Sequence, residues 1–151
     1  MNTFTQDLKR GSIGEERIES FLKSKNNTVV NVSNNPEYYH KGDLIVNDLL
    51  VEIKADSRIS RTQNLFLEYE RDYFNYVDAG WFVRTEADYL FYLCSCSNEC
   101  YVYSMRELKD YITQHPGSFD IKECDDGYKV VRAYALHKDC LPHQTFRLEV
   151  A

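Results

Sequence analysis

Two carboxylates and an amine, Asp43, Glu52 and Lys54, interrupt the apolar alternation of the stretch GDLIVNDLLVEIKAD, from Gly42 to Asp56. Carboxylate oxygens are the ligands that Mg²⁺ prefers, and a bound divalent cation lowers the pKa of water and neutralises charge on a phosphate. A nearby ammonium can orient the attacking water or stabilise the same developing charge. These residue types therefore suit metal-assisted hydrolysis of a phosphodiester.

The spacing of the stretch predicts a β-hairpin that brings the two carboxylates together. Asn47-Asp48 is a good two-residue turn because both residue types tolerate positive φ. Counting back from this turn places Asp43 opposite Glu52, with Cβ atoms about 4.5–5.5 Å apart. Lys54 falls on the same face as Glu52, because side chains alternate along a strand. Like charges in this position repel, and a divalent cation between them would remove the repulsion.

The opposite face of the hairpin is apolar and is expected to bury against a helix; it carries Leu44, Val46, Leu49, Val51 and Ile53. An amphipathic strand with a polar exposed side is common, and the strand pattern alone favours that simpler interpretation. Glu15 shifts the balance towards a site. It lies in an otherwise apolar helical stripe formed by Phe4, Leu8, Gly11, Glu15, Ile18 and Leu22. An inward carboxylate needs a cation, which is either a bound metal or a lysine such as Lys54.

The remaining pattern predicts one α/β domain over residues 1–151, built around a mixed sheet. Strands are expected at 28–33, at 65–70 and at 128–136, and a hairpin around Ser97-Asn98 joins 88–95 to 99–105. A helix is expected from 105 to 115, ending at Pro116-Gly117. The basic segment 57–64 is expected to be a loop.

Composition narrows the class of protein. The chain has 151 residues, a net charge of −6 and a pI near 5.2. No apolar run approaches the roughly 18 residues that a membrane span needs, and the first residues lack a signal-peptide layout. We expect a cytoplasmic protein that does not enter a membrane. The acidic charge argues against a nucleic-acid binder, which normally has a basic footprint.

Despite that charge, the order of the motifs resembles the PD-(D/E)XK nuclease superfamily, in its small phage, bacterial and Holliday-junction-resolvase-like branches. The resemblance rests on RGSIGE (Arg10 to Glu15) at a helix, then Asp43, then Glu52-Ile53-Lys54. TQNLFLEYE (62–70) and TEADYLFY (85–92) are also similar to segments of small members. The similarity spans roughly residues 8 to 112. Gly42 stands where the superfamily name has a proline.

The resemblance implies a restriction-endonuclease-like αβββ core with a central mixed sheet flanked by helices. It implies a metal-dependent deoxyribonuclease, an endonuclease of a bacterial or phage-infected cell. Asp43 and Glu52 would ligate Mg²⁺, or Mn²⁺ in its place, with Glu15 as a further contact and Lys54 as the catalytic amine. A site role for Glu68 is no better supported than a place on the strand surface, and Asp56 is left out of the site.

Substrate contacts and partners are less constrained. Five basic residues near the motif in sequence could bind phosphates of DNA: Lys9, Arg10, Lys41, Arg58 and Arg61. Solvated surface charges are an equal alternative. A homodimer would suit cleavage of both strands, although no heptad or exposed stripe indicates one. The alternative function is a catalytically silent nucleic-acid-binding or assembly module on the same fold.

Overall fold

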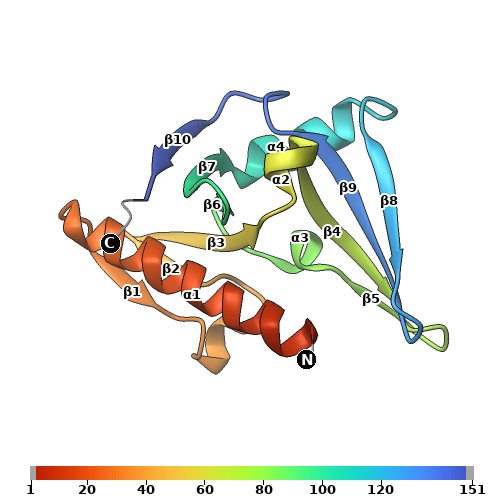
Figure 1. Cartoon of the computed structure of the whole chain (residues 1–151), viewed down its shortest axis with the longest axis horizontal. Helices are drawn as coiled ribbons and strands as arrows, with labels where there is room; N and C mark the ends of the chain where they lie inside the picture. Colours follow the sequence, from red (N-terminus) through yellow and green to blue (C-terminus); the bar gives the residue numbers. More distant parts are fainter. Residues whose placement is uncertain (1–2, 149–151) are drawn as a thin grey trace.

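The computed structural model describes residues 3–148, with side chains from residue 11 onward. Within that range the long strands form two sheets (Figure 1). The first is mixed, because β3 and β6 are parallel and its other neighbouring strands are antiparallel. Its order is β1 (Val29–Asn31), β2 (Leu44–Val46), β3 (Leu49–Asp56), β6 (Tyr89–Cys94), β7 (Glu99–Ser104) and β10 (Gln144–Arg147).

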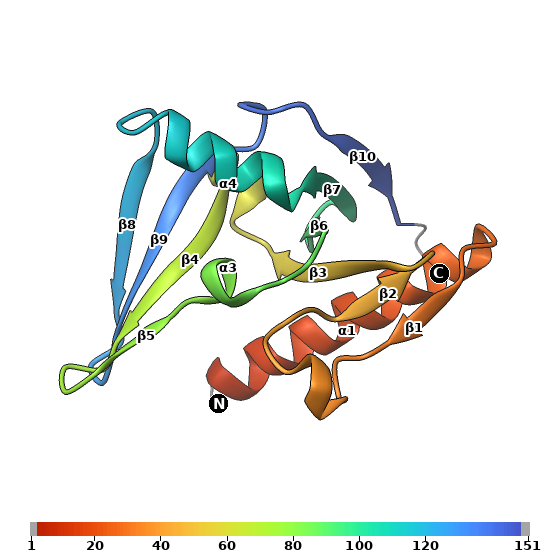
Figure 2. The same cartoon turned by 180° about the vertical axis from the view of Figure 1, so that it is seen from behind.

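Helix α1 (Thr3–Ser24) covers one face of this sheet, as Figure 2 shows from behind. Its residues Ile18 and Leu22 pack in one core cluster with the apolar face of the β2–β3 hairpin. Leu44, Val46, Val51 and Ile53 are buried there as predicted. Leu49 differs, because it follows the turn directly and remains 43% exposed.

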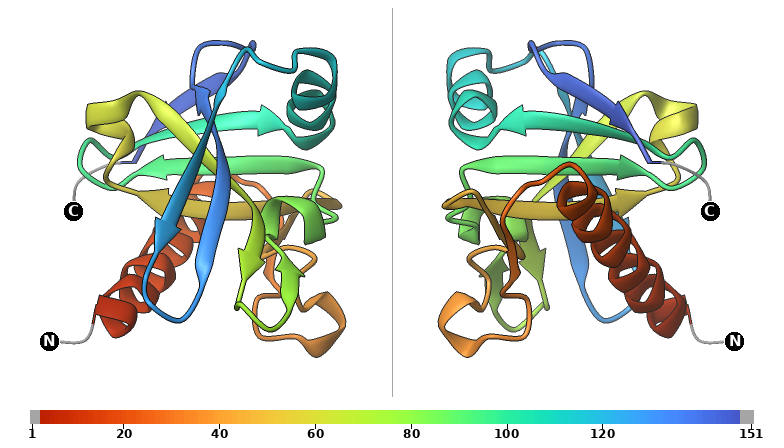
Figure 3. Two further views of the ribbon diagram at one scale, coloured as in Figure 1. Left: turned by 90° about the vertical axis from the view of Figure 1, so that its right-hand side faces the viewer. Right: turned by 90° about the vertical axis from the view of Figure 1, so that its left-hand side faces the viewer.

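A second, antiparallel sheet and helix α4 (Met105–Gln114) pack against the other face, where the sequence predicted a helical layer. This sheet has the order β5 (Val77–Ala79), β4 (Asn64–Asp72), β9 (Val130–His137) and β8 (Asp120–Asp125). Its strands run steeply across those of the first sheet (Figure 3). Its residues Leu65, Leu67 and Leu136 share a core cluster with Leu90 and Tyr103 of the first sheet.

The parallel pairing of β3 with β6 requires the chain to leave the first sheet and return. It does so through α2 (Ile59–Thr62), β4, β5 and α3 (Trp81–Arg84). The predicted loop at 57–64 is therefore wrong in part, because Ile59 is buried and anchors a short helix there. The predicted strands near 65–70 and 128–136, the 88–105 hairpin and the helix starting at 105 are present. Within residues 3–148, no helix is both long and apolar enough to cross a membrane.

Candidate active site

The β2–β3 turn has the predicted geometry. Asn47 and Asp48 have φ angles of 47° and 71°, so both adopt the left-handed conformation that a tight hairpin turn requires. The strands pair in the expected register, with Leu44 opposite Val51. The regular pairing stops there, one residue short of the expected pair between Asp43 and Glu52.

Asp43 leaves the strand in a defined way. Its N–H donates to Val51 O at 2.8 Å, and its own carbonyl accepts from Val32 N at 2.9 Å. Its Oδ2 accepts a 2.8 Å hydrogen bond from Ile53 N, so the carboxylate occupies the position of a strand carbonyl beside β3. A side chain held in this way lies at the edge of the β2–β3 pairing, where it lines a cavity together with Glu52 and Lys54.

Glu52 and Lys54 lie on the polar face of β3. Glu52 is only 7% exposed, and Lys54 Nζ lies 3.2 Å from its Oε1. Thr85 Oγ1 is 3.4 Å from Glu52 Oε2 but 3.0 Å from Lys41 O. The Thr85 hydroxyl has one proton and donates it to the closer acceptor, the Lys41 carbonyl. Glu52 Oε2 is therefore left without a strong hydrogen-bond donor.

Glu15 approaches Asp43 from α1. The neighbouring Gly14 is buried, and a methyl group at its Cα would lie 3.1 Å from Ala55 Cβ, so the helix lies close to β3. The sequence prediction that Glu15 turns inward agrees with this placement. Glu15 and Asp43 are near enough to share a hydrogen bond, and the charges of Glu52 and Lys54 also act on Glu15.

These contacts raise the pKa of two carboxyl groups. The pKa of Glu15 is raised to about 8, first by burial and then by the charge of Asp43 and the hydrogen bond with it. The pKa of Glu52 is raised to about 7, again chiefly by burial, although Lys54 lowers it. One ammonium therefore does not compensate for the burial of Glu15 and Glu52, and Glu15 keeps its proton near neutral pH.

A cavity of about 230 Å³ opens over Asp43, Glu52 and Lys54. Its other walls come from two places that the sequence motif did not indicate. The first is the end of the second sheet and α3, which supply Arg71, Trp81 and Arg84. The second is the loop 33–42, which supplies Ser33, Tyr38, Tyr39, His40 and Gly42. The sequence did not lead to the prediction of Arg71, Trp81, Arg84 or Thr85 as site residues, although the lone tryptophan was a signal that pointed to this region.

Gly80 fixes the position of Trp81. Its N–H donates to Tyr69 O at 2.9 Å, at the bulge where the β4–β9 register shifts. A Cβ at residue 80 would lie 2.3 Å from Glu68 O, so no larger residue fits without displacing backbone. Trp81 then lies against Lys54, whose Nζ is 4.8 Å from the centre of the indole ring. Glu52 and Trp81 together hold the ammonium in place.

Arg84 is an incompletely paired cation in the same cavity. Its Nη1 lies 3.1 Å from His40 Nε2 and 3.7 Å from Asp78 Oδ2. Because a guanidinium can only donate, His40 Nε2 is the acceptor in this contact. Arg84 Nε is buried and has no hydrogen-bond partner among the described residues. An anionic ligand near this side chain would meet an available positive charge.

The predicted phosphate-binding residues fall in different places. Lys9 and Arg10 belong to α1, and their side chains lie outside the described part of the chain. Lys41 is exposed and lies 3.7 Å from Glu86. Arg61, on α2, is exposed and lines neither the site cavity nor the groove next to it.

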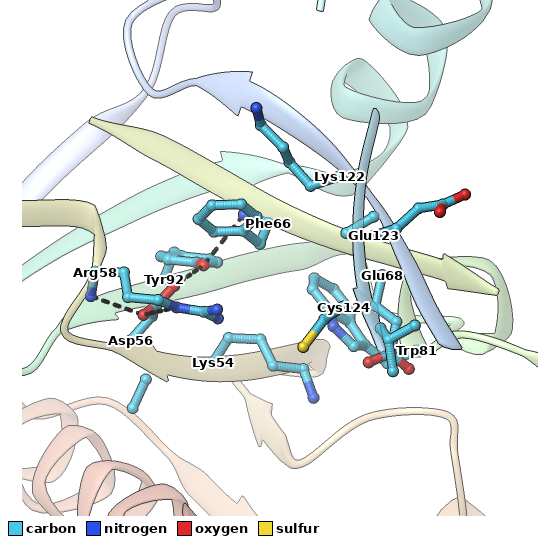
Figure 4. A pocket seen from close by; sticks show the side chains of 13 residues that line it. Lys54, Asp56, Arg58, Phe66, Glu68, Trp81, Tyr92, Lys122, Glu123 and Cys124 are labelled. Carbon is cyan, nitrogen blue, oxygen red and sulfur yellow. Dashed lines mark hydrogen bonds and ion pairs between the residues drawn. The ribbon is translucent and has the colours of Figure 1, made fainter. Parts of the chain in front are cut away.

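Arg58 is engaged in its own local contacts. Its Nε lies 3.1 Å from Asp56 Oδ1, and its guanidinium lies 4.7 Å from the centre of the Phe66 ring (Figure 4). Asp56 also accepts a 2.8 Å hydrogen bond from Tyr92, so it is held away from the three site carboxylates. Glu68 pairs with Arg71 at 2.7 Å. Both acids are thus neutralised by cations of their own.

The arrangement supplies three convergent carboxylates and a fixed ammonium, which is a donor set suited to a hard divalent cation. Among residues 11–148, no set of three or more His, Cys, Asp or Glu side chains already has the geometry of a metal-binding group. No protein-family model matches this chain, and neither a curated protein nor a solved structure is significantly similar to it.

Proposed function

We propose that this protein is a metal-dependent nuclease that hydrolyses phosphodiester bonds, with DNA as its substrate and internal cleavage as its mode. One observation carries the proposal. Asp43 and Glu52 lie beside Lys54 in the lining of one cavity, and Glu15 reaches Asp43 from α1. A purely structural role does not explain buried like charges that raise one another's pKa, whereas a cation-binding role does.

The three carboxylates fit Mg²⁺ or Mn²⁺ by their chemistry. All are hard oxygen donors, and the raised pKa values of Glu15 and Glu52 indicate a shortage of positive charge. Asp43, Glu52 and Glu15 would hold the ion. When bound, a divalent cation supplies Lewis acidity towards the phosphate and lowers the pKa of a neighbouring water. Binding requires Glu15 to give up its proton, so affinity should rise with pH.

The remaining residues of the cavity have roles that do not depend on the ion. Lys54 presents a compact positive charge at a fixed point, where it can stabilise a phosphate oxygen or orient a water. Its contacts with Glu52 and Trp81 already restrain the side chain, so it loses less conformational entropy when substrate binds. Arg84 and Arg71, on the opposite wall, are placed to contact neighbouring phosphates.

The chain order supports a PD-(D/E)XK-type nuclease. The chain begins with α1 followed by β1, β2 and β3, which pair antiparallel in sequence order, and the acidic residues lie on α1 and on this meander. Gly42 replaces the proline of the superfamily name for a local reason. A Cβ at this position would lie 2.7 Å from Leu50 Cδ1, so a larger residue would have to displace that leucine.

A catalytically silent nucleic-acid-binding or assembly module is the second candidate. The net charge of −6 favours it, because repulsion from DNA phosphates weakens binding without a cation. The two functions separate in one experiment. Purified protein is incubated with supercoiled, linear, branched and single-stranded DNA in Mg²⁺, in Mn²⁺ and in EDTA. Cleavage that requires the cation supports the nuclease, and binding without cleavage in every condition supports the module.

A further inference from the structure

A second cavity adjoins the candidate site. This inter-sheet groove, of about 440 Å³, lies between β3 and the second sheet. Lys54 and Trp81 line both the groove and the site cavity, so the two spaces meet at the proposed catalytic amine. Figure 4 shows Lys54 and Trp81 at one end of the groove and Arg58 at the other. A chain bound through a phosphate at Lys54 would therefore have its next chemical group at the mouth of the groove.

The groove is lined by flat rings with cations against them. Lys54 lies over Trp81, and the guanidinium of Arg58 lies 4.7 Å from the centre of the Phe66 ring. Tyr92 fixes the position of Phe66, because its hydroxyl accepts a 3.2 Å hydrogen bond from Phe66 N. Aromatic rings and guanidinium planes are the surfaces on which proteins stack unpaired bases.

The charge of the groove suits a base better than a phosphate. The lining carries three carboxylates, Asp56, Glu68 and Glu123, and three cations, Lys54, Arg58 and Lys122. Asp56 pairs with Arg58 at 3.1 Å, Glu68 pairs with Arg71 at 2.7 Å, and Glu123 shares Arg132 with Glu70 and Asp72. The lining is thus close to neutral and still has acceptors for the amino groups of a base. A phosphate would gain little there, whereas an uncharged ring would bury apolar surface and find hydrogen-bond partners.

We infer that the inter-sheet groove takes an unpaired base of the nucleic-acid strand whose phosphate lies at Lys54. This inference rests on the proposed function, because it uses Lys54 as the phosphate position. A base can enter the groove only after it leaves its partner, and unpairing costs a few kcal/mol in an intact duplex. Single-stranded, frayed or branched DNA is therefore the preferred substrate class over continuous duplex.

The test uses Trp81, the only tryptophan in the chain, as a built-in reporter. Its fluorescence is titrated in EDTA with a DNA strand of about 12 nucleotides, a typical size for single-strand sites, and with the same sequence as a duplex. We expect saturable quenching by the strand and at least about tenfold weaker binding of the duplex, given the unpairing cost. Equal affinities, or no change in emission with either probe, would overturn the inference.

Variants connect the signal to the groove. Phe66→Ala should weaken strand binding by about tenfold, since one stacked base contributes roughly 1–3 kcal/mol. Phe66→Leu keeps most of the apolar volume, so it should fold even where Phe66→Ala does not, and it should show the same loss because it lacks the aromatic ring. Phe74→Ala removes an aromatic residue that is 64% exposed in the β4–β5 loop and should bind like the wild type. Unchanged binding in both Phe66 variants would contradict a stacking role.

The outcome separates this inference from the proposed function. Quenching by the strand in EDTA from a protein that cuts no DNA in Mg²⁺ would support the groove and reject the nuclease. Cation-dependent cleavage with equal binding of strand and duplex would support the nuclease and reject the groove as a base site.

Discussion

Beside each sheet of this protein, three carboxylates lie near one cation, and the two groups differ in how well the cation satisfies them. In the site cluster beside the six-stranded sheet, Lys54 ion-pairs with Glu52 alone among the described carboxylates, and the pKa of Glu15 is raised by burial and by the charge of Asp43. In the cluster on the four-stranded sheet, a single guanidinium contacts all three acids. Arg132 lies within ion-pair distance of Glu70, Asp72 and Glu123.

Burial and donor number account for the difference. Glu52 is nearly inaccessible, whereas the Glu123 side chain is 59% exposed. Arginine has five donors in a planar fork, while lysine is a compact charge. Hydrogen bonds from Arg132 to Glu123 and then to Glu70 raise the pKa of Arg132, so that cluster is satisfied internally. A count of acidic residues is thus a poor guide to function, and unsatisfied acids under a cavity are a better one.

The largest effect should come from removing a ligand in the site cluster. Asp43→Asn and Glu52→Gln each keep the size of the side chain and remove a charged oxygen. We expect the rate of cation-dependent cleavage to fall by much more than roughly 10–100-fold. That smaller loss is typical when the changed residue only supports a metal ligand. Plasmid nicking rates and Mn²⁺ titration calorimetry measure the two losses.

The matched controls for these variants lie in the other cluster. Glu70→Gln and Asp72→Asn should leave both the cleavage rate and Mn²⁺ affinity unchanged. Full Mn²⁺ affinity in both site variants would reject the assignment of the site.

Lys54→Ala should remove activity while leaving the metal site in place. Loss of one preorganised donor typically costs about 10²–10³ in rate. Lys54→Arg should restore only part of the activity, since a planar fork does not replace a point charge. Lys129→Ala is the control, because Lys129 Nζ also lies over a ring, 5.3 Å from the Tyr128 centroid, but in the connection between β8 and β9. If Lys54 is only the ion-pair partner of Glu52, its loss should instead lower the melting temperature, and activity should fall in parallel with unfolding.

The sequence predicted those parts of the site that depend on local spacing. The tight turn at Asn47-Asp48 set the hairpin register, and strand alternation placed Glu52 and Lys54 on one face. Helical spacing placed Glu15 on the inner side of α1. The prediction failed by one residue at Asp43, because its side chain bonds to Ile53 N in place of the next strand pair.

The parts that the sequence did not predict depend on contacts between distant segments. Trp81 reaches Lys54 only because Gly80 fits against the β4 bulge, a contact that has no sequence period. Strand β8 was missed because all six of its residues are exposed, so it lacks the alternation of a half-buried strand. Arg58 was expected at a phosphate but pairs with Asp56 two residues earlier, a local contact that its charge alone did not reveal.

The stability of the metal-free protein should fall as pH rises. The carboxyl groups of Glu15 and Glu52 have pKa values of about 8 and about 7 in the fold, against an ordinary value of 4.5. Between these values the folded protein binds more protons than the unfolded chain, so the free energy of unfolding decreases with pH. In EDTA, the melting temperature should therefore be higher near about pH 5 than near about pH 8.

Two additions test the origin of this pH dependence. Glu15→Gln should flatten the decrease, because it removes the group with the larger shift. Mn²⁺ should stabilise the protein most at the higher pH, where the carboxylates are free of protons. A pH profile that is the same in wild type and Glu15→Gln would contradict the raised pKa of Glu15.

The smallest effect is expected from Arg132→Gln in the second cluster. Arg132 on β9 is the register partner of Glu70 on β4 and of Glu123 on β8, so its guanidinium connects three strands. Its loss leaves like charges on adjacent strands, and because the site is exposed and screened by salt, we expect the melting temperature to fall by only a few degrees. The difference in melting temperature between the two proteins should shrink at high salt. Salt screens both the attraction between Arg132 and the acids in the wild type and the repulsion among the acids in the variant.

Cleavage and Mn²⁺ affinity should be unchanged in Arg132→Gln, since Arg132 lines neither the site cavity nor the inter-sheet groove. If Arg132→Gln were folded but inactive, the cluster around Arg132 would also contribute to function. The incomplete neutralisation of the carboxylates near Lys54 would then no longer be what distinguishes the functional cluster from the structural one.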